Sequence, residues 1–273
     1  MTTAHATLTT SADRAARRQR EAAFYDRYAD VQRVDAVDFA PVLSAERRPW
    51  NPYWHAYDLA RRHLTRPGMR ALDFGCGIGI AALHLAKLGY LAAGFDISAR
   101  SIAVADRLAD QHHLADRCQF AVASAQQFEY EDAAFDLVFG IDVLHHVDID
   151  DALAETVRVL RPGGIAIFKE PVQSPLDTWR ESRLGRRLAP GGTSFDPDHH
   201  VTEDERKLTH ADLALMRSHF ARTAERRFGL ISRLHRLIPR CGPTGRGCLQ
   251  RADHLLLHDR GPLSRLGDTV VCV

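Results

Sequence analysis

The sequence lacks the features that mark secreted or membrane-spanning proteins. Its 273 residues include five cysteines, an odd number without regular spacing, which argues against a disulfide framework and favours reduced thiols. No stretch approaches the roughly 18 consecutive apolar residues of a membrane span. Residues 1–20 contain no apolar segment typical of a secretory signal. We therefore expect a cytoplasmic protein.

The sequence also has almost no excess of charge of either sign. It carries 36 Lys and Arg against 35 Asp and Glu, a formal net charge of +1. A nucleic-acid-binding domain usually shows a basic surface, so we expect no nucleic-acid partner. Two histidines four residues apart, His254 and His258, have no third ligand nearby in the sequence, so we predict no metal site.

What the sequence does contain is a regular alternation of strand-like and helix-like segments. Between the predicted strands lie amphipathic stretches, and Arg161-Pro162-Gly163-Gly164 ends the third of them. Such alternation predicts an α/β fold with a doubly wound, mostly parallel sheet. The predicted strands are residues 70–74, 91–95, 118–122, 135–140 and 165–169, with a last strand in "DTVVCV" at the C-terminus.

A glycine-rich turn follows the first predicted strand in "ALDFGCGIG", residues 71–79. Glycines after a strand let a ligand approach the backbone, at the sheet edge where doubly wound folds bind ligands. Asp96 closes the next strand 23 residues after Asp73, where a carboxylate can accept hydrogen bonds from a ribose. A dinucleotide fingerprint requires a third glycine where this chain has Ile80. Asp73 would be unfavourable beside a pyrophosphate but favourable beside a cationic amino group.

In order along the chain, "LDFGCGIG", "GFDIS", "FDLVFGIDVLHHV" and "VLRPGGIAIFKEP" resemble the motifs of class I S-adenosylmethionine-dependent methyltransferases of the small-molecule type. The resemblance covers roughly residues 55–172. It implies a seven-stranded sheet whose last strand is antiparallel and inserts beside the fifth. A methyltransferase domain is expected in residues 51–273, preceded by an N-terminal helical lid segment in residues 1–50. The first dozen residues are rich in Thr and Ala and are expected to be disordered. Cap insertions are expected at about 171–220 and 231–266, and the residue pattern itself predicts a helix at about 203–219.

The resemblance assigns roles to residues at the strand ends. The methionine moiety of S-adenosyl-L-methionine is expected at Asp73 and the turn, Asp96 is expected to bind the ribose, and Ile97 to pack on the adenine. Ser124 replaces an acid that the family often has, so Ala125 and Gln126 are the better candidates for the adenine amino group. The full set expected to bind the cofactor is Asp73, Gly75, Cys76, Gly77, Gly79, Asp96, Ile97, Ser124, Ala125, Gln126, Ile141 and Asp142.

Three residues are candidates for a general base. An alcohol, amine or acidic carbon acceptor needs one, whereas a carboxylate or thiolate does not. His145 and His146 follow the fourth strand at the mouth of the expected crevice, and Glu170 ends the fifth. Helix packing for the histidines, and capping or an arginine pair for Glu170, are the alternatives.

Other residues are candidates for a lid or for substrate contact, with core packing or solvent exposure as the alternative. They are Tyr25, Tyr28, Trp50, Tyr53, Trp54, His199 and His200. Residues 226–240 mix apolar residues with five arginines, which leaves contact with an anionic membrane surface open beside a packed cap helix.

The prediction is therefore methyl transfer to a small-molecule acceptor, such as a metabolite or natural-product intermediate, with S-adenosyl-L-homocysteine as product. A noncatalytic ligand- or partner-binding subunit of the same fold remains the alternative, followed by a lipid-linked or nucleic-acid substrate. A nucleic-acid enzyme is disfavoured because "IDVL" stands where base-methylating relatives carry Asn/Asp-Pro-Pro-aromatic. The sequence indicates neither the acceptor atom nor the oligomeric state.

Overall fold

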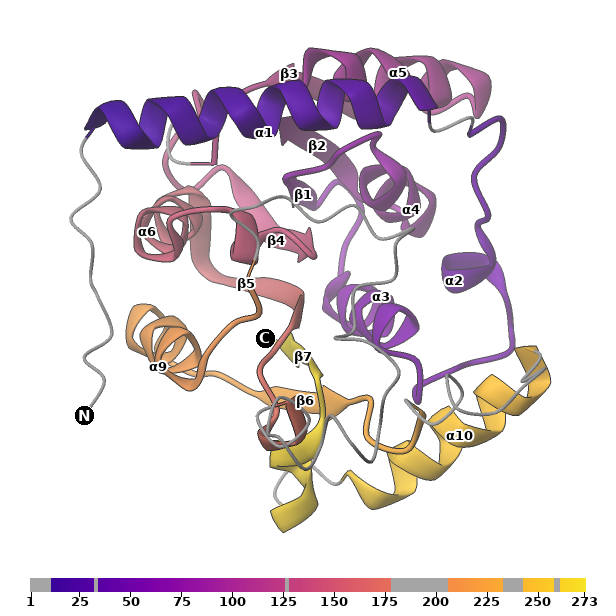
Figure 1. The fold of residues 1–273 in the computed structure, drawn as a ribbon. Helices are drawn as coiled ribbons and strands as arrows, with labels where there is room; N and C mark the ends of the chain where they lie inside the picture. The colour runs from indigo at the N-terminus through magenta and orange to yellow at the C-terminus, as the bar shows by residue number, and fades with distance from the viewer. Residues whose placement is uncertain (1–10, 32–33, 126–127, 178–205, 233–242, 258–260) are drawn as a thin grey trace.

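The computed structural model describes residues 11–31, 34–125, 128–177, 206–232, 243–257 and 261–273. A seven-stranded sheet runs through the centre of the molecule, with helices on both faces (Figure 1). Its strands are β1 (Arg70–Phe74), β2 (Leu91–Asp96), β3 (Cys118–Val122), β4 (Phe135–Ile141), β5 (Leu160–Pro171), β6 (Glu225–Phe228) and β7 (Thr269–Cys272).

The strand order is β3-β2-β1-β4-β5-β7-β6. The pairs from β3 to β5 are parallel, whereas β7 is antiparallel to both β5 and β6. This confirms the doubly wound fold and the closing strand expected beside the fifth. Since the order reverses between β1 and β4, the carboxyl ends of β1, β2 and β4 border the crevice in which such folds bind ligands.

The helices divide into two groups by the sheet face that they cover. One core joins the α3, α4 and α5 side to the sheet through residues such as Tyr57, Leu83 and Leu108. The other joins α6 and α9 through Leu153 and Leu213. The helical segments are α1 (Ser11–Val31), α2 (Ala40–Leu43), α3 (Pro52–His63), α4 (Ile80–Leu88), α5 (Ala99–Gln111), η1 (Leu144–His146), α6 (Ile149–Val159), α9 (His210–His219), α10 (Pro243–Leu256) and η3 (Pro262–Leu266).

Alternation along β1 determines which side of the sheet each residue faces. Ala71 belongs to the core under α4, while Leu72 and Phe74 belong to the opposite core. Asp73 therefore faces α4, where its Oδ2 accepts a hydrogen bond from the Ala82 amide at 2.8 Å. A carboxylate is thereby placed inside the crevice at the beginning of the helix.

Helix α1 crosses the carboxyl-end side of the sheet and packs along α5 (Figure 1). Asp26 fixes it there, because one of its oxygens accepts from the Ser98 hydroxyl at 2.6 Å and from the Arg100 amide at 3.1 Å. Both donors lie at the N-terminus of α5, where an acidic side chain is favoured by the orphan amides. A lid function for residues 1–50 and the domain boundary at residue 50 stay predictions.

Three segments differ from the sequence expectation. The fifth strand begins at Leu160 rather than residue 165, because Arg161-Pro162-Gly163-Gly164 forms a bulge within it between two paired stretches. Helix α9 begins at His210 rather than near residue 203. Leu208 instead bridges to Val172, and a Thr209–Asp212 capping box starts the helix.

For the arginine-rich segment 226–240, a packed cap helix was expected, with contact to a membrane surface left open. Its first residues instead complete β6, where Arg227 is buried and the Arg226 guanidinium lies over the Phe228 ring. Residues 233–240 lie outside the described part of the chain. Among the described residues, no helix is both long and apolar enough to cross a bilayer.

Candidate active site

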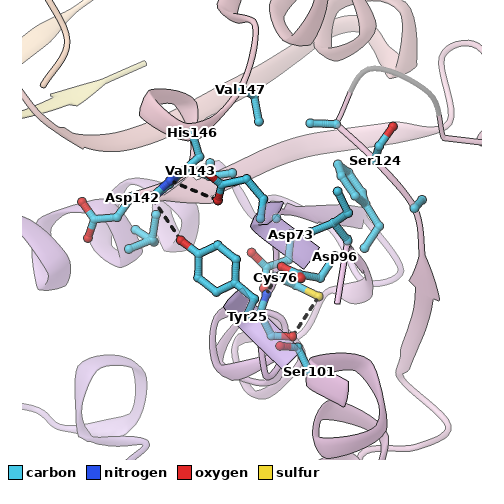
Figure 2. A pocket seen from close by; sticks show the side chains of 18 of the residues that line it. Tyr25, Asp73, Cys76, Asp96, Ser101, Ser124, Asp142, Val143, His146 and Val147 are labelled. Atoms are coloured by element: carbon cyan, nitrogen blue, oxygen red, sulfur yellow. Dashed lines mark hydrogen bonds and ion pairs between the residues drawn. The ribbon is translucent and has the colours of Figure 1, made fainter. Parts of the chain in front are cut away.

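A cavity of about 480 Å³ opens at the carboxyl ends of β1, β2 and β4, below α1. Its walls contain most of the predicted site residues together with several from α1 (Figure 2). Those predicted from the sequence are Tyr25, Tyr28, Tyr53, Asp73, Gly75, Cys76, Gly77, Asp96, Ile97, Ser124, Ala125, Ile141, Asp142 and His146.

The glycine turn lies against this cavity in a backbone conformation that side chains disfavour. Gly75, Gly77 and Gly79 have φ values of 66°, 50° and 80°. A Cβ on Gly75 would lie 2.4 Å from Val143 Cγ2, whereas a Cβ on Gly77 would meet no atom within 4 Å. Gly77 therefore leaves open space for a ligand at the backbone.

Gly79 serves a different purpose from the one predicted. A Cβ there would lie 2.7 Å from the Ala105 Cβ and 2.9 Å from the Phe120 ring, and Gly79 is not among the residues that line the cavity. Its position is therefore explained by close packing of the turn on α5 and β3 rather than by ligand contact.

Asp73 and Asp96 place two carboxyl groups in the cavity wall. Burial raises the pKa of Asp73 to about 7, with the nearby Asp96 adding to the shift. Asp96 accepts from the Gly77 and Ser98 amides, both at 2.9 Å, yet burial still raises its pKa. Among the described residues, neither carboxyl group forms an ion pair with a basic side chain, so a cationic ligand would stabilise their charged forms.

The end of β4 contributes a second strained turn. Asp142 has a φ of 54°. Its amide donates to the Lys169 carbonyl at 2.8 Å, and its carboxylate pairs with the Lys169 ammonium. This anchoring leaves Ile141 and Asp142 in the cavity wall, although the Asp142 charge is already compensated.

On the opposite side, residues 123–125 line the cavity beyond β3, next to Ile97. Ala125 is buried, and Ser124 lies in the wall at the position where members of the resembled family often have an acid (Figure 2). Gln126 lies outside the described residues, as do His199 and His200. Their assigned roles stay predictions.

The aromatic residues divide between two places. Tyr25, Tyr28 and Tyr53 line the cavity. Trp50 instead contacts the Arg251 guanidinium at 4.4 Å and borders a smaller cavity beside β6 and α10, while Trp54 is buried under Arg48. The sequence proximity of the tryptophans to Tyr53 suggested one cluster. Trp50, however, precedes α3, and Trp54 follows Tyr53 on that helix, where neighbouring side chains point about 100° apart.

Of the three candidates for a general base, His146 lines the cavity, whereas His145 and Glu170 do not. The Glu170 side chain is fully buried below η1. One of its oxygens accepts from the amides of Val143 and Leu144 at 2.9 and 2.8 Å, and the other lies 2.7 Å from His145 Nδ1. The expectation that Glu170 faces the pocket is therefore wrong, because its carboxylate is bound by the backbone amides of the turn that follows β4.

Helix α1 supplies cavity residues that the sequence analysis did not identify. Arg17, Arg18 and Glu21 lie in the wall with Tyr25 and Tyr28. In the sequence, charged residues at these positions are typical of a helix face exposed to solvent. Their place in the cavity wall follows only from the docking of α1 over the strand ends. Among the described residues, no group of three or more His, Cys, Asp and Glu side chains could hold a metal ion.

Comparison with known proteins adds the family. A family model described as "Methyltransferase domain" matches residues 72–168. "Methyltransferase GfsG" of Streptomyces halstedii is 33% identical over 146 residues, 52% of this chain and 50% of that protein. The "Ubiquinone/menaquinone biosynthesis C-methyltransferase UbiE" of Brucella anthropi is 33% identical over 190 residues, 62% of this chain and 70% of that protein.

Among solved structures, the [4+2]-cyclase SpnF matches with a TM-score of 0.55 and 20% identity, over 93% of this chain and 94% of that one. This similarity shows the fold alone, since one fold can support different reactions. The chain spans about half or less of the length of the first curated relatives it matches. The extent and identity of the match to UbiE nevertheless show that the chain belongs to the class I S-adenosylmethionine-dependent methyltransferases, whose cofactor is S-adenosylmethionine.

Proposed function

We propose that the protein transfers the methyl group of S-adenosylmethionine to a small-molecule acceptor, such as a metabolite or natural-product intermediate. The observation that carries the proposal is the pair of carboxyl groups beside the open backbone at Gly77, with Asp73 buried and Asp96 partly buried. The names of two relatives also support the proposal, since GfsG and UbiE are both named as methyltransferases.

The residues present fit the cofactor. Asp73 would hold the ammonium group of its methionine part, where a cation offsets the cost of a buried carboxylate. Asp96 would accept from the ribose hydroxyls, and its carboxylate is already oriented by the Gly77 and Ser98 amides. Ile97, Ser124 and Ala125 would surround the adenine. When bound, S-adenosylmethionine supplies an electrophilic methyl group on a cationic sulfur.

The chain's own contribution is to orient the reactants and to exclude water. Alignment of nucleophile and methyl carbon lowers the barrier of an in-line displacement. Tyr25, Tyr28 and Tyr53 give the cavity an aromatic lining, and Ile141 and Val143 add aliphatic side chains to its wall. The acceptor would lie between this lining and His146, under the cover of α1.

The test is incubation of the purified protein with methyl-labelled S-adenosylmethionine and a panel of small alcohols, phenols, amines and carbon acids. We expect label transfer to at least one class, together with formation of S-adenosylhomocysteine. Binding of S-adenosylmethionine without transfer to any member would favour the noncatalytic alternative.

A further inference from the structure

Three side chains form a line at the acceptor end of the cavity. The Tyr25 hydroxyl lies 3.1 Å from His146 Nε2, and a Glu21 carboxylate oxygen lies 3.7 Å from His146 Nδ1. Glu21 is buried, with 6% of its surface exposed, and all three side chains line the cavity. Figure 2 shows the Tyr25 ring reaching across the cavity with its hydroxyl directed at His146.

The carboxylate favours one protonation form of this imidazole. A neutral histidine carries its proton on one ring nitrogen and a lone pair on the other. The Glu21 oxygen is too far from Nδ1 for a hydrogen bond, but its negative charge favours a proton on Nδ1, which leaves the Nε2 lone pair to accept the Tyr25 hydroxyl. The nitrogen that faces the cavity is therefore arranged to receive a proton from a hydroxyl group.

The groups around His146 leave its ring able to accept a proton from a ligand. The Arg17 guanidinium donates to the His146 carbonyl at 2.8 Å and so helps to hold the residue rather than its ring. The ring of His145 lies 4.1 Å away, centroid to centroid, but His145 is occupied by Glu170. Asp148 lies in the same wall. His146 is thus the histidine of the pair that can reach a ligand.

We propose that the acceptor is an alcohol or a phenol, that His146 is the general base that takes its proton, and that Glu21 orients the imidazole. The Tyr25 hydroxyl marks the position at which the acceptor hydroxyl binds. This inference rests on the proposed methyltransferase function and specifies the atom that is methylated. It also assigns part of the reaction to α1, outside the region that the family model matches.

The chemistry balances without a further reagent. The acceptor oxygen forms a bond to the methyl carbon as the carbon–sulfur bond breaks, and the electron pair of that bond remains on sulfur. The hydroxyl proton moves to His146 Nε2, and Glu21 stabilises the resulting imidazolium. A carboxylate needs no base, whereas an amine or a carbon acid could also use one. The Tyr25 hydroxyl at Nε2 shows that this position receives an O–H group, which favours a hydroxyl acceptor.

The first test reads the tautomer of His146 directly and needs no acceptor. Nitrogen-15 NMR of histidine-labelled protein with S-adenosylhomocysteine bound distinguishes a ring N–H from a lone pair, and His146→Gln assigns the signals. We expect the proton on Nδ1 and the lone pair on Nε2 at neutral pH. A proton fixed on Nε2 would overturn the proposal, because that nitrogen could not accept one.

Variants test the role of the carboxylate. Glu21→Gln is expected to shift the His146 tautomer toward Nε2–H. Glu155→Gln, which removes a carboxylate that pairs with Arg158 on α6, is the matched control and should leave the spectrum unchanged. An unchanged His146 signal in Glu21→Gln would remove Glu21 from the proposal.

The transfer assay separates this inference from the proposed function. Label found on oxygen, with His146→Gln lowering kcat about 100-fold or more at unchanged affinity for S-adenosylmethionine, would support the base. Label on carbon, nitrogen or sulfur would overturn the hydroxyl assignment while leaving methyl transfer intact. Failure of the wild-type protein to bind S-adenosylhomocysteine would instead contradict the proposed function.

Discussion

The cavity wall formed by β1, β2 and β4 and the wall formed by α1 hold their polar groups in different ways. On the strand side, Asp73 and Asp96 accept from backbone amides of adjoining turns. On the helix side, Tyr25 and Glu21 approach His146 through side chains that are more than 120 positions away in the sequence. The strand wall is thus fixed by local backbone geometry, and the helix wall exists only when α1 is docked.

The largest effect is expected on the strand side, from Asp96→Ala. This change removes a charge-assisted acceptor for the ribose and for two backbone amides, so the dissociation constants of S-adenosylmethionine and S-adenosylhomocysteine should rise ten- to hundredfold, about 1.4–2.7 kcal/mol. Calorimetric titration measures both. Asp110→Ala, at an exposed position of α5, is the control and should bind normally. Normal binding by Asp96→Ala would remove this residue from the site.

Glu170→Gln tests the support below the cavity. The carboxylate accepts from two amides and contacts His145 while fully buried. A glutamine oxygen can keep the two amide contacts, but its NH2 group brings no charge and presents a donor, not an acceptor, to His145 Nδ1. We expect a loss of about 1–3 kcal/mol in the free energy of unfolding. Urea denaturation measures it, with the partly exposed Glu155→Gln expected to lose about 0.5 kcal/mol or less. Equal losses in the two variants would contradict a supporting role for Glu170.

Asp73 should make cofactor binding depend on pH. Because burial raises its pKa to about 7, the carboxylate is increasingly protonated below that pH, and the affinity for S-adenosylmethionine should fall by up to about tenfold per pH unit. Above pH 7 the dependence should flatten, and Asp73→Asn should abolish it. Titrations between pH 5.5 and 7.5 test this. A pH-independent affinity in the wild-type protein would show that Asp73 does not hold a cation.

The same shift affects the stability of the ligand-free protein. The folded-state pKa lies above the ordinary value of 3.8, so the folded protein retains a proton that the unfolded chain has lost between about pH 4 and 7. The contribution of Asp73 to stability therefore falls as the pH rises through this window. Asp73→Asn should remove that decline, which pH-dependent thermal unfolding can detect.

The smallest effect comes from a matched glycine pair. Gly77 and Gly68 both have positive φ, at 50° and 75°, and at neither would a Cβ meet an atom within 4 Å. Alanine at either position should cost about 1–2 kcal/mol of stability through backbone strain. Gly77→Ala alone should also weaken binding of S-adenosylhomocysteine, because its Cβ would enter the cavity. Equal affinity of the two variants for S-adenosylhomocysteine would show that the glycine turn does not contact the ligand.

The contrast between the walls also explains what sequence reasoning could predict. Asp73, Gly77 and Asp96 were identified because strand ends and turns are local features, and their periodicity places them at one edge of the sheet. The same reasoning failed for Glu170, since its position at the end of a strand does not show that the amides of Val143 and Leu144 turn back to meet it.

The helix wall could be predicted only in part in this way. Tyr25 and Tyr28 were predicted as candidates for a lid or for substrate contact, whereas Glu21 and Arg17 have the ordinary appearance of an exposed helix face. Their place in the cavity depends on the docking of α1, to which Asp26 contributes at the N-terminus of α5. Nothing local in the sequence of α1 indicates which of its charged residues face the site.

The central claim is that the strand wall binds S-adenosylmethionine, and the most direct test is calorimetric titration of the purified protein with S-adenosylmethionine, S-adenosylhomocysteine and, as a control, NADH. We predict binding of the first two in the micromolar range and none of NADH. Tight binding of NADH, or no binding of either methionine derivative, would contradict the account.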